Sequence, residues 1–451
     1  MRRILPKNLL SLADSLSTPL YAVGGSVRDF LAGLTPSTHD WDICSPLSAD
    51  EFSKAAAALG FNVTAVYRNT GTVKLKDIEG VDYEYSSFRS DTYVRGVHVP
   101  VAIHFTDDIA LDARRRDFTA NAVYFDIRRG EFADPLNGIA AISEKRLTTV
   151  APAKKVFGED GLRLMRLARQ AAQLGFFPDK DCLAGAKANA ALIQDISSER
   201  ILTELNAILT ADEKYGVRDG HYRGLQLLDE TGVLAYILPE LAQGKGLTQR
   251  SDFHKYDVLE HSLRAARYAP APLRLAALLH DVGKPFCMLR DGNAHEHPVE
   301  GVRLATDILH RLKAPKKEMQ KILFLIQWHM YDFNCQTKES KLRRFFVSNA
   351  NRLDDLLALK QADFSACTDD FSPAPTCVRW KALLKRMENE NVPFSLKTLA
   401  IKGDDLLTLG IAPARIATIL QRLLTHTAVE PKDNKKEKLL RLALVFEKEL
   451  F

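Results

Sequence analysis

The chain has few cysteines, and none is spaced for a shared structural role. Its 451 residues include six cysteines, and no two of them form a Cys-x-x-Cys pair. This spacing argues against a zinc knuckle and against a disulfide framework, and it predicts a protein of a reducing cytosol. The six are Cys44, Cys182, Cys287, Cys335, Cys367 and Cys377.

Long apolar runs are also missing. No uninterrupted apolar stretch reaches the roughly 20 residues of a membrane-spanning helix, so we expect a cytoplasmic protein with no membrane partner. The first residues, MRRILPKNLLSLADSL, hold only short apolar runs, which predicts an amphipathic helix rather than a signal peptide. The sequence has no low-complexity tract, and its length predicts about three domains.

The excess of positive charge is small. Lys plus Arg total 62 and Asp plus Glu total 57, so the formal net charge is only +5. This balance is compatible with a nucleic-acid partner, but many solvated surfaces have the same balance. Charge alone therefore does not identify a partner.

The most informative stretch runs from Tyr21 to Ile43, YAVGGSVRDFLAGLTPSTHDWDI. A short apolar run predicts a buried strand, the two glycines that follow predict a tight turn, and Ser26 is placed to cap a helix. A glycine turn that opens a helix directs free backbone N–H groups at one point, which suits a phosphate. Arg28, on the first turn of this helix, could add a charge-assisted contact.

Two carboxylates follow this helix in the segment Asp40-Trp41-Asp42. In a strand, period-2 alternation places both aspartates on one face, roughly 7 Å apart along the strand, with Trp41 on the other. Such a pair can hold one or two hard divalent ions, as magnesium chemistry on a nucleoside triphosphate requires. The alternative is a hairpin turn followed by an acidic loop, but the two features in this order favour the nucleotide site.

GGSVRD followed by DWD resembles the head of the class II tRNA nucleotidyltransferases, the CCA-adding enzymes, and of their poly(A) polymerase relatives. The resemblance implies an α/β nucleotidyltransferase head followed by an all-α neck, body, HD domain and tail. We expect the head at residues 1–145, the neck and body with the base-selecting template at 146–250, the HD domain at 251–367 and a tRNA-binding tail at 368–451. The resemblance also implies that Asp40 and Asp42 bind Mg²⁺ and that Gly25 and Arg28 hold a triphosphate.

Further head motifs extend the resemblance. Segments 63–67, 72–75 and 81–85 are predicted strands. Glu84 matches the family's third acid, which completes the metal site or helps to deprotonate the attacking hydroxyl; Asp82 is the rival candidate, and an acidic solvent-facing edge is the alternative. The family motif around Arg116 assigns that residue to phosphate and Asp117 or Asn121 to the ribose.

Residues 89–109 are rich in turn formers and polar residues, which predicts a mobile connection. The family has a flexible loop here that shapes the site during successive additions. The usual sequence at its centre is replaced by Val97-His98-Val99-Pro100, so no role is assigned to these residues.

From Phe157 the pattern becomes helical, with Asp160, Arg163, Arg166 and Arg169 at intervals of three, which predicts one slowly drifting helix face. A carboxylate accepts from the exocyclic amine of cytosine or adenine, and a guanidinium donates to the ring acceptor, whereas guanine and uracil present a carbonyl to the carboxylate. Asp160 and Arg163 match the family's base-selecting template, and Arg166 and Arg169 would then face the triphosphate. An exposed i,i+3 salt bridge is the alternative.

A second group of candidates lies beyond residue 250. Imidazoles and carboxylates gathered from several helices form metal sites in helical bundles. The doublet in ALLHDVGKP resembles the HD-superfamily phosphohydrolases, which implies a divalent transition metal whose bound water hydrolyses a phosphoester. The alternative is that these are unrelated histidines of the core or the surface. His297 and His329 suggest room for a second metal. The candidate ligands are His261, His280, Asp281, His297, His329 and Asp363.

The resemblance covers nearly the whole chain in order. It implies an enzyme that adds C and A to the 3′ end of tRNA from CTP and ATP, with possible hydrolysis at RNA ends by the HD domain. Partial enzymes that add only CC or only A, a poly(A) polymerase, and a protein that acts chiefly as an HD phosphohydrolase are the alternatives.

Overall fold

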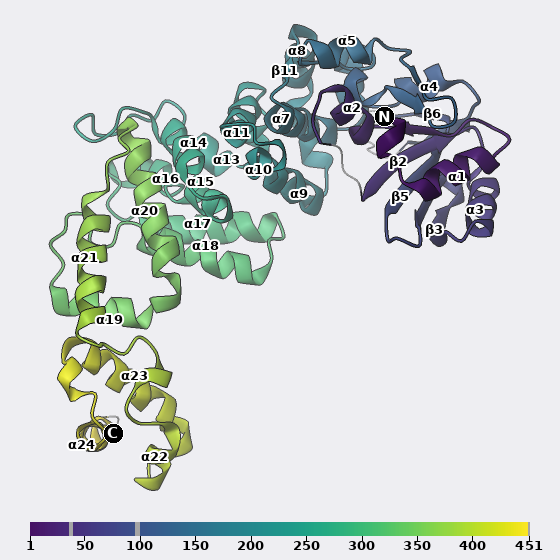
Figure 1. Cartoon of the computed structure of the whole chain (residues 1–451). Helices are drawn as coiled ribbons and strands as arrows, with labels where there is room; N and C mark the ends of the chain where they lie inside the picture. Colours follow the sequence, from purple (N-terminus) through teal and green to yellow (C-terminus); the bar gives the residue numbers. More distant parts are fainter. Residues whose placement is uncertain (36–38, 95–99, 450–451) are drawn as a thin grey trace. The chain divides into compact units, whose positions relative to one another are not determined.

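The computed structural model describes residues 1–35, 39–94 and 100–449. The chain forms two compact units, Met1–Gln243 with Ile308–Ala314, and Gly244–Asp307 with Pro315–Phe451 (Figure 1). No helix in the described ranges combines the length and the hydropathy needed to cross a membrane.

The head is built on a mixed sheet. The described head residues form a seven-stranded sheet in the order β3-β4-β5-β2-β1-β8-β9. Only β2 and β5 pair in parallel, and the other neighbours are antiparallel. The strands are β1 (Tyr21–Val23), β2 (Asp40–Ser45), β3 (Asn62–Tyr67), β4 (Thr72–Lys76), β5 (Asp82–Ser87), β8 (Tyr124–Asp126) and β9 (Glu131–Ala133). Helices α1 (Lys7–Ser15), α2 (Gly25–Leu31), α3 (Ala49–Ala58) and α4 (Ile109–Arg114) accompany the sheet.

The segment predicted as a mobile connection is partly regular. Strands β6 (Arg89–Thr92) and β7 (Ala102–Phe105) pair antiparallel, with Arg89 opposite Phe105. This pairing joins residues that a local pattern does not connect, which is why the sequence did not predict it. Val97, His98 and Val99, at the predicted centre of the loop, lie outside the described residues.

The helical neck departs from the prediction at Asp160. Helix α6 (Ala153–Glu159) ends there, and α7 (Leu162–Leu174) begins two residues later. Gly161 lies so close to another segment that a Cβ would be 2.4 Å from the Leu192 carbonyl oxygen. Asp160 is extended, and its Oδ1 accepts the backbone N–H of Leu162 at 3.0 Å. The predicted single helix face shared by Asp160 and Arg163 is therefore wrong.

The rest of the first unit is mainly short helices. These elements are α5 (Gly138–Ser143), β10 (Arg146–Leu147), β11 (Phe177–Pro178), α8 (Lys180–Asn189), α9 (Ser198–Leu209), α10 (Ala211–Tyr215), α11 (Gly220–Glu230), α12 (Leu234–Ile237) and α13 (Pro239–Ala242). Helix α7 buries Leu164, Met165 and Leu167 among them, which fixes the direction of its arginines.

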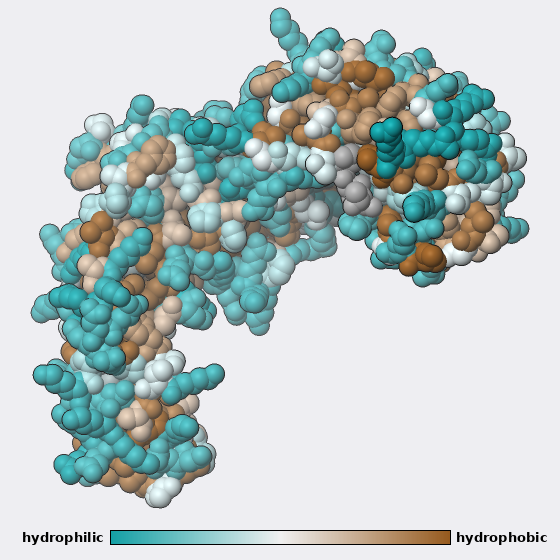
Figure 2. Space-filling view, in the orientation of Figure 1, coloured by the Kyte–Doolittle hydropathy of each residue, from teal (hydrophilic) through white to brown (hydrophobic). Residues whose placement is uncertain are grey.

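The second unit is helical. Its helices are α14 (Val258–Tyr268), α15 (Arg274–Leu279), α16 (Lys284–Asp291), α17 (His297–Arg311), α18 (Lys316–Trp328), α19 (Glu339–Ser348), α20 (Leu353–Thr368), α21 (Pro375–Asn389), α22 (Gly403–Thr408), α23 (Pro413–Val429) and α24 (Lys436–Lys448). The last residues of α17, from Ile308 on, belong to the first unit. The buried carboxylate of Asp332 accepts from the Trp380 indole at 2.9 Å and from Arg379 at 2.8 Å, which fixes α21. Hydrophilic residues cover much of the visible face of this unit, with hydrophobic residues between them (Figure 2).

Candidate active site and candidate metal centre

The glycine turn packs directly on the acidic strand. Gly24 has φ +77°, and a Cβ there would lie 2.6 Å from Oδ2 of Asp42. Gly24, not Ser26, is the N-cap of α2, so the predicted serine cap is wrong. The Ser26 hydroxyl instead donates to the Asp40 main-chain carbonyl at 3.3 Å. The turn and the start of β2 thus hold each other in place.

Four carboxylates share one face of the sheet. Asp40 and Asp42 are exposed, whereas Trp41 between them is fully buried, as the alternation in DWD predicts. The parallel register places Asp42 opposite Glu84 and Asp40 opposite Asp82. Loss of surrounding water and the charges of Glu84 and Asp40 raise the pKa of Asp42, against the opposing effect of Arg116 and Arg166.

Carboxylates gathered on one face fit a hard divalent cation, because such an ion takes several oxygen ligands at once. Of the two candidates for a third acid, Glu84 is the one whose charge raises the pKa of Asp42. Glu84 also approaches Lys74 Nζ at 3.6 Å, and Asp82 pairs with Lys76 at 3.1 Å.

A chain of hydrogen bonds, which we call the polar relay, runs from α2 to α7. Arg28 is buried; its Nη2 donates to Oδ1 of Asp29 at 2.6 Å and its Nη1 to Oδ1 of Asn121 at 2.8 Å. Asn121 Nδ2 donates to Oδ1 of Asp117 at 2.9 Å. Arg166 Nε donates to Oδ2 of Asp117 at 2.7 Å. The hydroxyl of Tyr215, which donates to Asp29, completes the relay.

Tyr215 lies at the end of α10, and its hydroxyl donates to Oδ2 of Asp29. Burial and Asp29 raise the pKa of Tyr215, so the phenol stays protonated at neutral pH. Burial disfavours the charged form of Asp117, but Arg166 and the Asn121 amide outweigh it and hold the pKa well below its usual range. The sequence did not predict Tyr215, because 186 residues separate it from its partner.

The remaining predicted arginines are each held by protein groups. Arg163 is buried and donates to the Val156 carbonyl at 2.9 Å, to Glu159 Oε2 at 2.8 Å and to the Arg115 carbonyl at 2.8 Å. Its carboxylate partner is therefore Glu159 rather than Asp160. Arg116 Nε donates to the Tyr124 hydroxyl at 3.1 Å.

Two pairs connect the template region to α9. Asp160 Oδ2 lies 3.9 Å from Arg200 Nη2. Arg169 Nε donates to Glu204 Oε2 at 2.6 Å. The start of α7 and its middle are thus both braced by α9, which fixes the direction in which the α7 arginines point.

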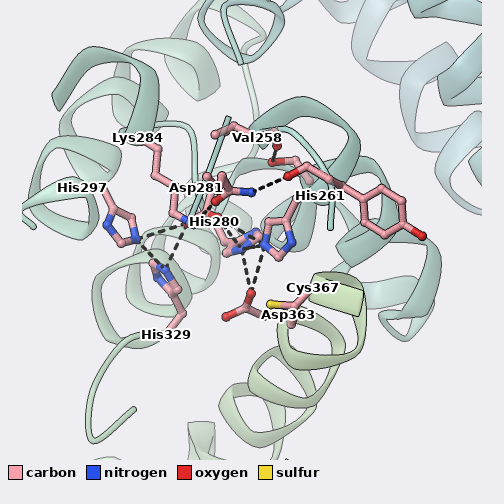
Figure 3. Close-up of polar contacts among 12 residues, drawn as sticks. Val258, His261, His280, Asp281, Lys284, His297, His329, Asp363 and Cys367 are labelled. Atoms are coloured by element: carbon pink, nitrogen blue, oxygen red, sulfur yellow. Dashed lines mark hydrogen bonds and ion pairs between the residues drawn. The ribbon is translucent and has the colours of Figure 1, made fainter. Parts of the chain in front are cut away.

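In the second unit, the six predicted residues converge on one point (Figure 3). His261 Nε2 lies 3.2 Å from His280 Nε2, and His297 Nε2 lies 3.1 Å from His329 Nε2. Asp281 stands between these two pairs, with Oδ2 3.3 Å from His261 and Oδ1 3.2 Å from His297. Asp363 Oδ1 lies 3.1 Å from His261 and 3.4 Å from His280. We call these six residues the HD cluster.

The Nδ1 contacts of three histidines indicate what the HD cluster fits. The Nδ1 atoms of His280, His297 and His329 lie 2.7, 2.6 and 2.7 Å from the backbone carbonyls of Ala277, Ala294 and Ile326. A neutral imidazole that donates from Nδ1 presents a lone pair at Nε2. A bound metal ion would use such lone pairs, and a backbone carbonyl at the other ring nitrogen is typical of histidine metal ligands. The donor set fits a divalent transition metal.

Two histidines of the HD cluster have shifted pKa values. Burial lowers the pKa of His280, but Asp281 and Asp363 overcome this effect and raise it to about 10. Burial lowers the pKa of His329 to about 4. The sequence did not single out Lys284, which contacts Asp281 Oδ2 at 2.6 Å and Gln249 Oε1 at 2.8 Å, nor His254 and Cys367 beside the cluster.

These features define the class as a nucleotidyltransferase head joined to an HD domain. A model of the poly A polymerase head domain matches residues 20–148, and a model of the probable RNA and SrmB- binding site of polymerase A matches 175–245. An HD domain model matches 254–356.

Known proteins extend the match. An A-adding tRNA nucleotidyltransferase of Deinococcus radiodurans is 30% identical over 426 residues, 89% of each chain. A multifunctional CCA protein of Xanthomonas campestris is 31% identical over 326 residues, 69% of this chain and 75% of that one. The crystal structure of a Bacillus stearothermophilus CCA-adding enzyme with CTP shares the fold, with a TM-score of 0.67, 24% identity and 98% of each chain covered. The chain belongs to the family of class II tRNA nucleotidyltransferases and poly(A) polymerases, in the form that carries an HD domain.

Gly24→Ala should disable nucleotide transfer by moving Asp42. The new methyl group would meet the Asp42 carboxylate at 2.6 Å, and displacing a reacting group by about 1 Å costs on the order of 10²-fold in rate. Gly33→Ala is the matched control, because Gly33 also has a positive φ (+69°) but nothing lies within 4 Å of its Cβ position. Both variants should lose stability, and only Gly24→Ala should lose turnover per folded molecule. Equal turnover in the two would contradict the packing argument.

Tyr215→Phe should loosen the polar relay. Removing a hydrogen bond to a charged group should lower the free energy of unfolding by about 1–3 kcal/mol, measured by urea denaturation. The KM for nucleoside triphosphates should rise more than kcat falls, because the variant leaves the acidic face intact. Tyr236→Phe, at a tyrosine that is 42% exposed on α12, is the control. Indistinguishable KM values for the two variants would show that the hydroxyl does not position the site.

Proposed function

We propose that this protein adds C and A to the 3′ end of tRNA from CTP and ATP. The observation that carries the proposal is the acidic face of β2 and β5, packed on the glycine turn in a chain of this family. In the reaction, the tRNA 3′-hydroxyl oxygen attacks the α-phosphorus, a new phosphodiester bond forms, and pyrophosphate leaves with the electrons of the broken bond.

The residues have the following proposed roles. Asp40 and Asp42 would hold Mg²⁺, which when bound neutralises charge on the phosphates, and Glu84 would complete the site or accept the hydroxyl proton. Gly25, Arg28, Arg116, Arg166 and Arg169 would hold the triphosphate, and Asp117 the ribose. Asp160 and Arg163 would select the base. For Arg28 and Arg166, the polar relay supports a positioning role alongside the phosphate contact.

A second candidate is addition of A alone. The observation in its favour is that the Deinococcus radiodurans relative, matched over 89% of both chains, is named an A-adding enzyme. We also propose that the HD cluster, with a divalent transition metal, hydrolyses phosphoesters at RNA ends, and that the protein acts in the cytoplasm. The proposed domain limits stay at 1–145, 146–250, 251–367 and 368–451. The matches of the three family models at 20–148, 175–245 and 254–356 support the division into the first three of these domains.

Nucleotide incorporation tests the transferase proposal. Purified protein with tRNA lacking its last three nucleotides should, with labelled CTP and ATP together, add two C and one A and then stop. Incorporation only of A, and only into tRNA that already ends in CC, would establish the second candidate. Long A-tails would identify a poly(A) polymerase. Asp42→Asn should reduce incorporation by roughly 10²-fold or more, whereas Asp82→Asn on the same face should retain it.

Hydrolysis tests the HD proposal separately. With a divalent transition metal added, Asp281→Asn should abolish hydrolysis of bis(p-nitrophenyl) phosphate, because Asp281 contacts both histidine pairs. The same variant should add CCA at the wild-type rate. Asp42→Asn should show the converse pattern. Equal loss of both activities in a well-folded Asp281→Asn protein would refute separate sites.

A further inference from the structure

A second group of soft ligands lies beside the HD cluster. One ring nitrogen of His254, one of His261 and the Sγ atom of Cys367 lie within 4.8 Å of one another. The His254 ring packs edge-on against the His261 ring, with centroids 5.0 Å apart at 88°. Cys367 is on the last turn of α20, and its side chain lies next to Asp363 (Figure 3). The three ligands therefore come from a loop and two helices.

His261 differs from the other histidines of the HD cluster. The other three direct Nδ1 at a backbone carbonyl, as described above, whereas Nδ1 of His261 is buried and has no hydrogen-bond partner among the described residues. The same is true of Nδ1 of His254. The His261 side chain is fully buried, so bulk water does not reach it. Two buried nitrogens on neighbouring rings thus lack a hydrogen-bond partner among the described residues, which is unfavourable.

We propose that His254, His261 and Cys367 form a soft-metal site that shares His261 with the HD cluster. Two imidazoles and a thiolate are the ligands that zinc and cobalt prefer, with a fourth position left open. Zn–N distances of roughly 2.0–2.1 Å and a Zn–S distance of about 2.3 Å require the three ligand atoms, which lie within 4.8 Å of one another, to move closer together. His254 is half-buried, which gives an ion a route to the site.

Metal binding at this site would release protons from its ligands. The Cys367 thiol, which now donates to the Asp363 carbonyl at 3.4 Å, would lose its proton to solvent on metal binding. If His261 coordinates the HD cluster through Nε2 at the same time, its Nδ1–H proton is also released. Because His261 is shared, filling this site should slow hydrolysis at the HD cluster and leave nucleotide addition unchanged.

Cobalt titration of the full-length, metal-stripped protein tests the proposal. Thiolate ligation gives a sulfur-to-cobalt charge-transfer band in the near ultraviolet. The band should appear in the wild type, disappear in Cys367→Ser and weaken strongly in His254→Gln. Cys377→Ser is the matched control, because Cys377 is buried and donates to the Leu357 carbonyl outside the group. Metal analysis should find one cobalt fewer per chain in Cys367→Ser than in Cys377→Ser.

Two results would overturn the proposal. One is a wild-type protein without the charge-transfer band, which would show that Cys367 does not bind the metal. The other is an equal metal content in Cys367→Ser and Cys377→Ser. If Cys367→Ser does not fold, His254→Gln decides the same question, since His254 is not part of the buried core. A band that persists in Asp281→Asn would show that the site stands even if the proposed HD hydrolysis fails.

Discussion

The ion pair between Asp117 and Arg166 is the contact on which the first unit depends. It joins the head to helix α7, and through Asn121, Arg28 and Asp29 it extends to Tyr215 on α10. A buried carboxylate such as Asp117 is unfavourable unless charged and hydrogen-bonding partners surround it, and leaving it unsatisfied costs about 1–3 kcal/mol. The polar relay meets this requirement with groups from both the head and the helical neck. The acidic strand face and the template region are therefore held in one geometry before any substrate binds.

The two candidate sites differ from the polar relay in how their charges are balanced. In the polar relay, each carboxylate described above accepts a hydrogen bond from a cationic, amide or hydroxyl group, so the relay has a structural role. On β2 and β5, by contrast, desolvation raises the pKa of Asp42, and the charges of Glu84 and Asp40 add to this effect. In the HD cluster, the Nε2 atoms of His297 and His329 face each other at 3.1 Å. Arg116 and Arg166 offset the effect on Asp42 only in part, and a bound cation would stabilise both groups of ligands further.

The sequence predicts those parts of the molecule that depend on local periodicity. Alternation in DWD places Asp40 and Asp42 on one face, whereas the six residues of the HD cluster are predicted from the resemblance to HD-superfamily phosphohydrolases. The failures involve contacts between distant segments. Gly161 packs against Leu192 and breaks the helix that the spacing of the arginines predicts. The pairing of β6 with β7 and the bond from Tyr215 to Asp29 likewise join segments that no local pattern relates.

The burial of Arg163 bears on base selection in the proposed reaction. A guanidinium has five N–H donors, and contacts with the carbonyls of Val156 and Arg115 and with Glu159 occupy three of them among the described residues. Two of these three partners are backbone carbonyls, so the position of the guanidinium is set by the main chain rather than by a flexible side chain. The donors that remain are sufficient for the single ring acceptor of cytosine or adenine. An arginine fixed in this way loses little conformational freedom on binding a base, and its geometry penalises a base whose acceptor lies elsewhere.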